Sequence, residues 1–287
     1  MTKKTRSLIE TSLNKKHIVD HADTCCDSPQ SPHPYPTFFT SLRRHVDTFV
    51  NLLYPAHCFS CGKSLHNEDR EYLCAQCSNG ISHITGVRCP RCGMGLGNYA
   101  LFSQEGCAEC KSQGLRFDGA FSAAYYEGAI KELIHRFKYG KQEFLAKPLA
   151  ELIVRHFREI DYNRPRIDIV AVVPLHRKKR RERGFNQADL LGRNAGKLLG
   201  LEVCLGGLKR TRNTRSQTIQ PYFRRRENVR GAFLVKKPEY FKGRDILLVD
   251  DVLTSGLTAS ECAKVLKEAG ARKVYVLTVA KSRRITA

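Results

Sequence analysis

Residues 245–258 constrain the fold of this chain more than any other segment does. A short apolar run, Ile246 to Val249, leads directly into two adjacent carboxylates, Asp250 and Asp251. A small hydroxyl-rich turn follows at 254–258, and a helix-like stretch comes next. This order predicts a buried strand, a turn and a helix. The turn would lie at the carboxyl end of the strand, which is where open α/β sheets bind ligands.

The turn carries groups that suit a phosphate. Free backbone N–H groups and the positive dipole end of a helix start attract anions, and Gly256 lets the backbone approach a ligand closely. Three side-chain hydroxyls add hydrogen-bond donors: Thr254, Ser255 and Thr258. Two carboxylates beside a phosphate would repel it, so we expect them to face sugar hydroxyls or a hydrated Mg²⁺. The segment therefore predicts a site for a ribose 5-phosphate.

An ordinary buried strand with an acidic exit and a Thr or Ser helix cap is the simpler alternative. It accounts for one capping residue but not for two acids and three hydroxyls together. The segment resembles the phosphoribosyl diphosphate (PRPP) loop of type I phosphoribosyltransferases. The resemblance implies that Asp250 and Asp251 hold the ribose hydroxyls, with Mg²⁺ bound together with PRPP. It also implies that five consecutive residues hold the 5-phosphate: Thr254, Ser255, Gly256, Leu257 and Thr258.

Eight of the twelve cysteines form four Cys-x-x-Cys pairs, namely Cys58/Cys61, Cys74/Cys77, Cys89/Cys92 and Cys107/Cys110. The basic start of the chain has no apolar segment behind it, so we expect no secretory signal and a cytoplasmic location. Disulfides are rare in reducing cytosol, and repeated pairs of this kind indicate zinc. Two pairs complete one tetrahedral site with no open position, so we predict two structural Zn²⁺ ions.

The spacing of the cysteines leaves two ways to pair them. Twelve residues separate Cys61 from Cys74, and 14 separate Cys92 from Cys107. We favour sequential pairing, which gives two zinc ribbons. Crossed pairing, first with third and second with fourth, is the competitor. An iron–sulfur cluster, or cysteines buried as ordinary core residues, are further alternatives.

Positive charge is concentrated in one part of the chain. The formal net charge is +21, and residues 164–230 hold 18 Lys and Arg against 5 Asp and Glu, a net charge of +13. A field of this strength attracts polyanions, either nucleic acid or diphosphate, although a solvated basic surface needs no partner.

The basic segment 173–187 follows an expected strand and precedes an expected helix. Guanidinium and ammonium groups at a strand exit suit a diphosphate or a nucleic-acid backbone. An exposed basic loop without a ligand is the alternative. Seven residues are candidates for contacts with diphosphate or nucleic acid: Lys138, Arg180, Arg181, Arg183, Asn186, Gln187 and Arg215.

Strands alternate with helices in the C-terminal part of the chain, which predicts an α/β fold with a parallel sheet flanked by helices. We expect strands at 119–126, 167–173, 201–205, 233–235, 246–249 and 274–280. We expect helices at 128–137, 143–159, 187–199 and 259–269, with a loop-rich stretch at 206–230. No run reaches the about 20 apolar residues of a membrane span.

The predicted domains follow from these patterns. They are a poorly ordered tail at 1–37, an amphipathic helix at 38–56, a double zinc-ribbon domain at 57–114 and a phosphoribosyltransferase-like domain at 117–284.

Several segments together resemble the ComF family of competence proteins. They are Leu52–Pro55, the four cysteine pairs, Phe137–Gly140, Val173–His176, Arg183–Gln187, Thr214–Thr218, Arg226–Val229 with Ala232–Phe233, and the acid-pair loop. The resemblance is specific, because generic phosphoribosyltransferases lack both the cysteine module and the Arg-Gly-Phe-Asn-Gln element. Ser255 stands where many family loops have Thr, which keeps the hydroxyl.

The resemblance implies a role in natural transformation or in the use of external DNA as a nutrient. Imported strands would be handled on the cytoplasmic side of the inner membrane, with peripheral association there. The implied partners are single-stranded or branched DNA, a competence helicase and single-strand-binding proteins.

Two functions from different classes fit these features. In the one we prefer, the chain handles imported single-stranded DNA and retains a site for PRPP or a related ribose phosphate. In the alternative, it is an active phosphoribosyltransferase that transfers phosphoribosyl from PRPP to an unidentified base or other acceptor. Asp250, Asp251 and Arg183 would then be catalytic, with Arg183 and Arg215 on the diphosphate. No segment plainly recognises a base.

Overall fold

The computed structural model describes residues 57–65, 72–96, 106–160, 165–213 and 222–283, all of which belong to the unit Asn51–Ala287. The predicted tail at 1–37 and the predicted amphipathic helix at 38–56 lie outside the described residues, as does Arg215. None of the helices in the described ranges is long and apolar enough to cross a membrane.

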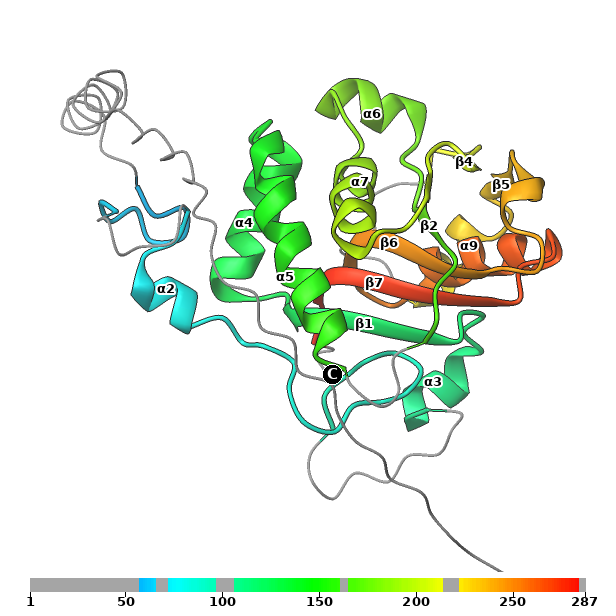
Figure 1. Ribbon diagram of the computed structural model, residues 1–287, viewed down its shortest axis with the longest axis horizontal. Helices are drawn as coiled ribbons and strands as arrows, with labels where there is room; N and C mark the ends of the chain where they lie inside the picture. The colour runs from blue at the N-terminus through cyan, green and yellow to red at the C-terminus, as the bar shows by residue number, and fades with distance from the viewer. Residues whose placement is uncertain (1–56, 66–71, 97–105, 161–164, 214–221, 284–287) are drawn as a thin grey trace, which may run out of the picture. The chain divides into compact units, whose positions relative to one another are not determined.

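A five-stranded parallel sheet forms the centre of the structure (Figure 1). Its strands lie in the order β1 (Gly119–Tyr125), β7 (Lys273–Lys281), β6 (Asp245–Leu253), β2 (Ile169–Val172) and β3 (Val203–Cys204). In the centre of the sheet, Leu247 of β6 is paired with Val170 on one side and Tyr275 on the other. Strands of this kind are apolar on both faces because helices cover both. The sheet and its helices confirm the predicted fold class.

Helices cover the two faces of the sheet (Figure 1). Alternate residues of β6 point to opposite faces, and Leu247 and Val249 lie in one hydrophobic cluster while Ile246 and Leu248 lie in the other. The first cluster includes residues of α4 (Gly128–Tyr139), η1 (Glu143–Leu145), α5 (Ala146–Arg158) and α7 (Gln187–Leu199). The second includes residues of α9 (Leu257–Glu268).

The stretch expected to be loop-rich, 206–230, contains regular elements. A strand, β4 (Leu208–Arg210), pairs antiparallel with β5 (Phe233–Val235), and a helix, α8 (Tyr222–Val229), lies between them in sequence. A short 3₁₀ helix, η2 (Pro238–Tyr240), follows. The partner of β4 is distant in sequence, and a three-residue strand is too short to show a period of two. Local patterning therefore could not reveal this pair.

The basic segment after β2 is also helical, as α6 (Arg177–Arg183). His176 caps this helix, because its Nδ1 accepts a hydrogen bond from the Lys178 N–H at 3.3 Å. None of the residues of α6 is buried. A helix without an apolar face has no hydrophobic periodicity to detect, so sequence analysis predicted no helix here.

The cysteine module contacts the sheet at β1. Two short helices, α2 (Ala75–Asn79) and α3 (Ala108–Gln113), each begin just after a cysteine. His83 forms a β-bridge with Ala124 of β1, and the Tyr125 N–H donates to the Ser82 carbonyl at 2.8 Å. Gly93 has φ +68°, and a Cβ there would lie 2.3 Å from the Ala120 carbonyl oxygen. Only glycine allows the knuckle to approach β1 this closely.

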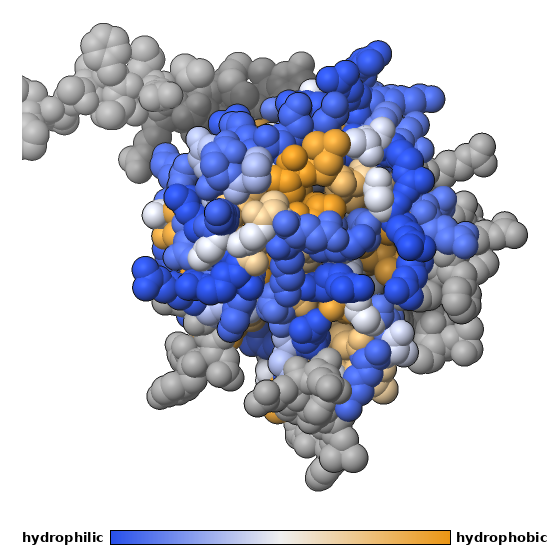
Figure 2. Space-filling view, turned by 90° about the vertical axis from the view of Figure 1, so that its right-hand side faces the viewer, coloured by the Kyte–Doolittle hydropathy of each residue, from blue (hydrophilic) through white to orange (hydrophobic). Residues whose placement is uncertain are grey.

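Hydrophilic residues cover most of the side that carries α3, α9 and β5 at the right of Figure 1. Figure 2 shows this side, where a smaller apolar patch is surrounded by hydrophilic side chains. Monomeric proteins commonly expose apolar patches of modest size. The hydrophilic surroundings are the more distinctive feature of this face.

Candidate functional site

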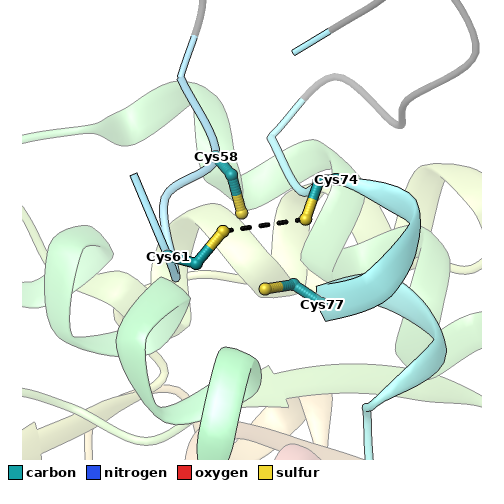
Figure 3. A group of neighbouring side chains, drawn as sticks. All are labelled: Cys58, Cys61, Cys74 and Cys77. Atoms are coloured by element: carbon teal, nitrogen blue, oxygen red, sulfur yellow. Dashed lines mark hydrogen bonds between the residues drawn. The ribbon is translucent and has the colours of Figure 1, made fainter. Parts of the chain in front are cut away.

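The first four cysteines converge on one point. The Sγ atoms of Cys58, Cys61, Cys74 and Cys77 all lie within 4.8 Å of one another and point toward one another (Figure 3). The Sγ atoms of Cys61 and Cys74 are 3.7 Å apart. Four thiolates around a tetrahedral zinc ion at about 2.3 Å lie about 3.8 Å from each other. The donor set and its spacing fit one structural zinc ion.

The second group consists of Cys89, Cys92, Cys107 and Cys110. Its Sγ–Sγ distances include 3.8 Å for Cys89 and Cys110, and 4.0 Å for Cys92 and Cys107. The Cys107 N–H also donates to the Cys89 sulfur at 3.2 Å. Each group joins two pairs that are consecutive in sequence, so sequential pairing is confirmed and crossed pairing is excluded. Neither group leaves an open position for water, as expected of structural sites.

The acid pair lies inside strand β6 rather than after it. The strand continues to Leu253, which is paired with Lys281 of β7, so the predicted strand end at Val249 is wrong. The long strand β7 provides pairing partners beyond that point. Because successive residues of a strand point to opposite faces, Asp250 and Asp251 start in different directions. The Asp250 carboxylate lies against the next peptide group, where its Oδ1 accepts the Asp251 N–H at 2.8 Å.

Lys138, in the last turn of α4, binds the acid pair directly. Its Nζ lies 2.7 Å from Oδ1 of Asp251, and the two side chains are only 17% and 11% exposed. Burial alone would lower the pKa of Lys138, but the charges of Asp251 and Asp250 and the hydrogen bond to Asp251 raise that pKa overall. The ammonium therefore stays charged and compensates Asp251. Sequence analysis gave Lys138 only as a candidate for contacts with diphosphate or nucleic acid, and not as a partner of the acid pair.

Asp250 titrates near neutral pH. Burial and the charge of Asp251 together raise the pKa of Asp250 to about 7, against opposing effects of Lys138 and Arg210. At neutral pH the carboxyl group exchanges between its protonated and ionised forms, so it can donate to or accept from a hydroxyl. The three groups Asp250, Asp251 and Lys138 together carry a net charge between zero and −1.

The turn after β6 leads into α9. Gly256 is the N-cap of this helix at φ +76°, and no side chain caps the helix. Leu115 and Phe117 lie 3.4 Å from where a Cβ of Gly256 would be, so the turn packs against these two side chains. Thr254 is exposed, whereas Ser255 is 9% exposed. The first N–H groups of an α-helix have no internal acceptors, which leaves this end suited to an anion.

Arg183 and Gln187 connect the basic helix to the same edge. Arg183 donates to Oε1 of Gln187 at 3.0 Å and to the hydroxyl of Tyr139 at 3.2 Å, and its guanidinium lies 4.9 Å from the centre of the Tyr139 ring. Gln187 donates to the Lys138 carbonyl at 3.5 Å. These contacts bring the ends of α4 and α6 and the start of α7 together beside the acid pair.

The other predicted residues of this group differ in environment. Asn186 is buried, and its amide donates to the Val173 carbonyl at 3.2 Å and to Asp189 at 2.7 Å, so it anchors the start of α7. Arg180 is 61% exposed and lies 3.8 Å from Asp189, and Arg181 is exposed. The structure thus separates an internal anchor from an exposed basic surface.

Two residues near the acid pair were not among the candidate site residues from the sequence. Tyr139 is 59% exposed and lies next to Arg183 and His135. It follows Lys138 within the Phe-Lys-Tyr-Gly motif, so the motif was the available signal. Arg210 reaches the region from β4, where burial lowers its pKa and the charge of Asp250 opposes that effect. No local pattern marks Arg210, because β4 was not recognised.

Comparison with known proteins gives the following similarities. A family model described as a double zinc ribbon domain matches residues 49–112, which include both cysteine groups. Competence protein F of Haemophilus influenzae is 29% identical over 228 residues, covering 78% of this chain and 96% of that protein. The DNA utilization protein YhgH of Escherichia coli O157:H7 is 31% identical over 208 residues, covering 71% of this chain and 88% of that protein.

A solved structure of an adenine phosphoribosyltransferase is also similar. It shares 14% identity and a TM-score of 0.34, and the match covers 50% of this chain and 73% of the other.

We expect the protein to bind two zinc ions per chain. Cys61→Ser should reduce the content to one, because it removes a ligand of the first group only. Metal content measured by mass spectrometry of the purified protein tests this. Cys204→Ala, a buried cysteine outside both groups, is the control and should keep both ions. An unchanged content in Cys61→Ser would contradict the assignment.

The raised pKa of Asp250 predicts a pH-dependent stability. The folded protein binds this proton more tightly than the unfolded chain, whose carboxyl titrates at the ordinary value of 3.8. The presence of Asp250 therefore lowers the free energy of unfolding progressively as pH rises from about 4 to about 7. Asp250→Asn removes this effect, so the stability of the variant relative to wild type should rise by about 1–3 kcal/mol between about pH 5 and pH 8. Urea unfolding across this range is the measurement, and a constant difference contradicts the raised pKa.

Proposed function

We propose a role in DNA uptake or DNA utilization for this chain, because it belongs to the ComF family, the family of competence protein F and of the DNA utilization protein YhgH. Within that role, we propose that it binds imported single-stranded DNA on its basic surface and a ribose 5-phosphate, free or as PRPP, at the edge of the sheet. The proposal of a ribose 5-phosphate site rests on one observation. The acid pair, Asp250 and Asp251, comes directly before the hydroxyl-rich start of α9, and Lys138 compensates its charge.

Charge compensation explains how two carboxylates can lie next to a phosphate site. The Lys138 ammonium neutralises Asp251, and Asp250 is partly protonated near neutral pH. An anionic ligand therefore meets little net negative charge. The carboxyl oxygens of Asp250 and Asp251 would bind the ribose hydroxyls, which are neutral donors and acceptors.

The start of α9 would bind the phosphate of the same ligand. Its free backbone N–H groups and the hydroxyls of Thr254, Ser255 and Thr258 supply donors, and the helix dipole adds a positive potential. Mg²⁺ would neutralise the charge of a diphosphate bound with it, as this ion commonly does on nucleotide substrates. Arg183 would contact the diphosphate, and the buried Gln187 would hold it beside Lys138.

The basic surface supports the DNA part of the proposal. Helix α6 carries six cationic side chains and one anionic one, and none of its residues is buried. Phosphate contacts from such a surface are independent of sequence and strongly dependent on salt. Tyr139 is an exposed aromatic ring near its end, and aromatic rings of this kind stack on bases of single strands.

Calorimetry with ribose, ribose 5-phosphate and PRPP in the presence of Mg²⁺ tests the sheet-edge site. We expect Asp251→Asn to weaken ribose 5-phosphate binding about 10-fold or more, because it removes a charged acceptor of the sugar hydroxyls. Thr258→Val should weaken ribose 5-phosphate but not ribose, since only the phosphate contacts its hydroxyl. Asp245→Asn, at the opposite end of β6, is the matched control.

Absence of binding by every pentose phosphate would refute the sheet-edge site without bearing on DNA binding. Release of diphosphate from PRPP in the presence of a panel of bases, measured in the same samples, tests for transferase activity. Turnover with any base would make the site that of an active phosphoribosyltransferase, the second candidate.

Fluorescence anisotropy with a labelled oligothymidylate at several salt concentrations tests the DNA part. Arg180→Ala/Arg181→Ala removes two exposed cations of α6, so we expect about 10-fold weaker binding at low salt and a log–log salt slope shallower by about 1.4. The control Lys147→Ala/Arg155→Ala makes the same charge change on exposed positions of α5. Equal effects of the two variants would show that only net charge matters and would contradict a binding surface on α6.

A further inference from the structure

A second basic site lies between α3, α8 and α9, and neither Asp250 nor Asp251 lines it. A cavity of about 280 Å³ opens there, lined by residues that include Gln113, Arg116, Arg226, Arg230, Ser260 and Lys264. Of the turn residues 254–258, only Leu257 contributes to its wall. The cavity is slightly smaller than the about 300–1,000 Å³ of pockets for drug-sized ligands, so it suits a phosphate with its attached sugar.

Positive charge converges on this cavity without matching negative charge. Four cationic side chains line it against one carboxylate, Glu261, whose Oε1 already accepts the Gly231 N–H at 2.6 Å. Lys264 has an exposed ion pair with Glu268 at 3.6 Å. In the described part of the chain, no carboxylate is within ion-pairing distance of the guanidinium groups of Arg116, Arg226 or Arg230. A bound anion would relieve their mutual repulsion.

Two features distinguish the wall of the cavity from an ordinary exposed surface. The Arg116 N–H donates to the Ser260 hydroxyl at 3.0 Å, which fixes the backbone of Arg116 against α9. Gln113 is 7% exposed, and its carbonyl oxygen Oε1 is buried without a hydrogen-bond partner among the described residues. A buried acceptor left without a donor is destabilising, and Gln113 lines the cavity, so a ligand there can supply the missing donor.

We propose that this cavity is a second nucleotide-phosphate site, separate from the sheet-edge site. Arg116, Arg226 and Arg230 bind the phosphate. The Gln113 carbonyl accepts a hydrogen bond from a hydroxyl or amino group of the attached sugar or base. The same chemistry belongs to a free nucleotide and to a nucleotide unit of a DNA strand. The residues that line the cavity are distant in sequence from α6. Helices α3 and α9, which border the cavity, lie on the mostly hydrophilic side shown in Figure 2.

The test uses the full-length, zinc-loaded protein in a Thr258→Val background, so that phosphate binding at the sheet-edge turn is weakened without adding a ligand that the cavity would also bind. Thymidine 5′-monophosphate, a short oligothymidylate and sulfate are the probes, and binding is measured by calorimetry. We expect Arg226→Ala/Arg230→Ala to weaken the binding of sulfate and of at least one thymidylate probe about 10-fold or more. Lys147→Ala/Arg155→Ala is again the control of equal charge change and should have a much smaller effect.

Gln113→Met separates the two parts of the site. It removes the carbonyl while keeping a side chain of similar size, so nucleotide binding should weaken about fivefold or more while sulfate, which has no donor, binds as before. Thermal stability should stay equal or rise, because the buried acceptor without a partner is gone. Loss for the monophosphate points to a free nucleotide, and loss for the oligonucleotide alone points to a strand.

Two results would overturn the proposal. One is that no probe is affected by Arg226→Ala/Arg230→Ala beyond the effect of the control. The other is that Gln113→Met weakens sulfate as much as nucleotide, or leaves both unchanged.

Discussion

The ion pair between Lys138 and Asp251 is the interaction on which the edge of the sheet depends. It joins the last turn of α4 to the central strand β6 and places a cation against two carboxylates. A pair this deeply buried is intolerant of change, because removing one partner leaves the other charged and poorly solvated. The contacts of Gln187 with the Lys138 carbonyl and of Arg183 with Tyr139 extend the connection to α7 and α6. The ends of α4 and α6 and the start of α7 thus meet beside this ion pair.

The cysteine module takes part in the same construction. Cys89, Cys92 and Cys110 belong to the hydrophobic cluster that also contains Leu115 and Phe117, and those two side chains lie directly beneath Gly256. A zinc ion held by four thiolates fixes the chain around it without needing a large apolar core. The second cysteine group thus packs in the same hydrophobic cluster as the two side chains next to the turn.

The sequence predicted the sheet, most of its helices and the cysteine groups, because these depend on local patterns. An apolar run such as 246–249 and two cysteines three positions apart are visible without knowledge of the partner. The elements that it did not predict depend on distant contacts or lack an apolar face. β4 exists through pairing with β5, and α6 buries no residue. The contact of Lys138 with Asp251 was hidden for the same reason, since its two residues are over 100 positions apart.

The chain offers phosphate groups two physically different environments. At the start of α9, backbone dipoles and hydroxyls lie beside the acid pair, whose charge Lys138 largely compensates. Discrimination between ligands there would come from the geometry of their sugar hydroxyls and hardly from charge. On α6 and in the cavity beside α9, guanidinium groups dominate. Exposed charges act over about 8–10 Å and are screened by salt, whereas buried pairs are screened much less. Binding of a strand to the basic surfaces should therefore vary with ionic strength while the sheet edge stays occupied. Under the proposed function, this difference would let the protein hold a ribose phosphate at the sheet edge while it releases DNA.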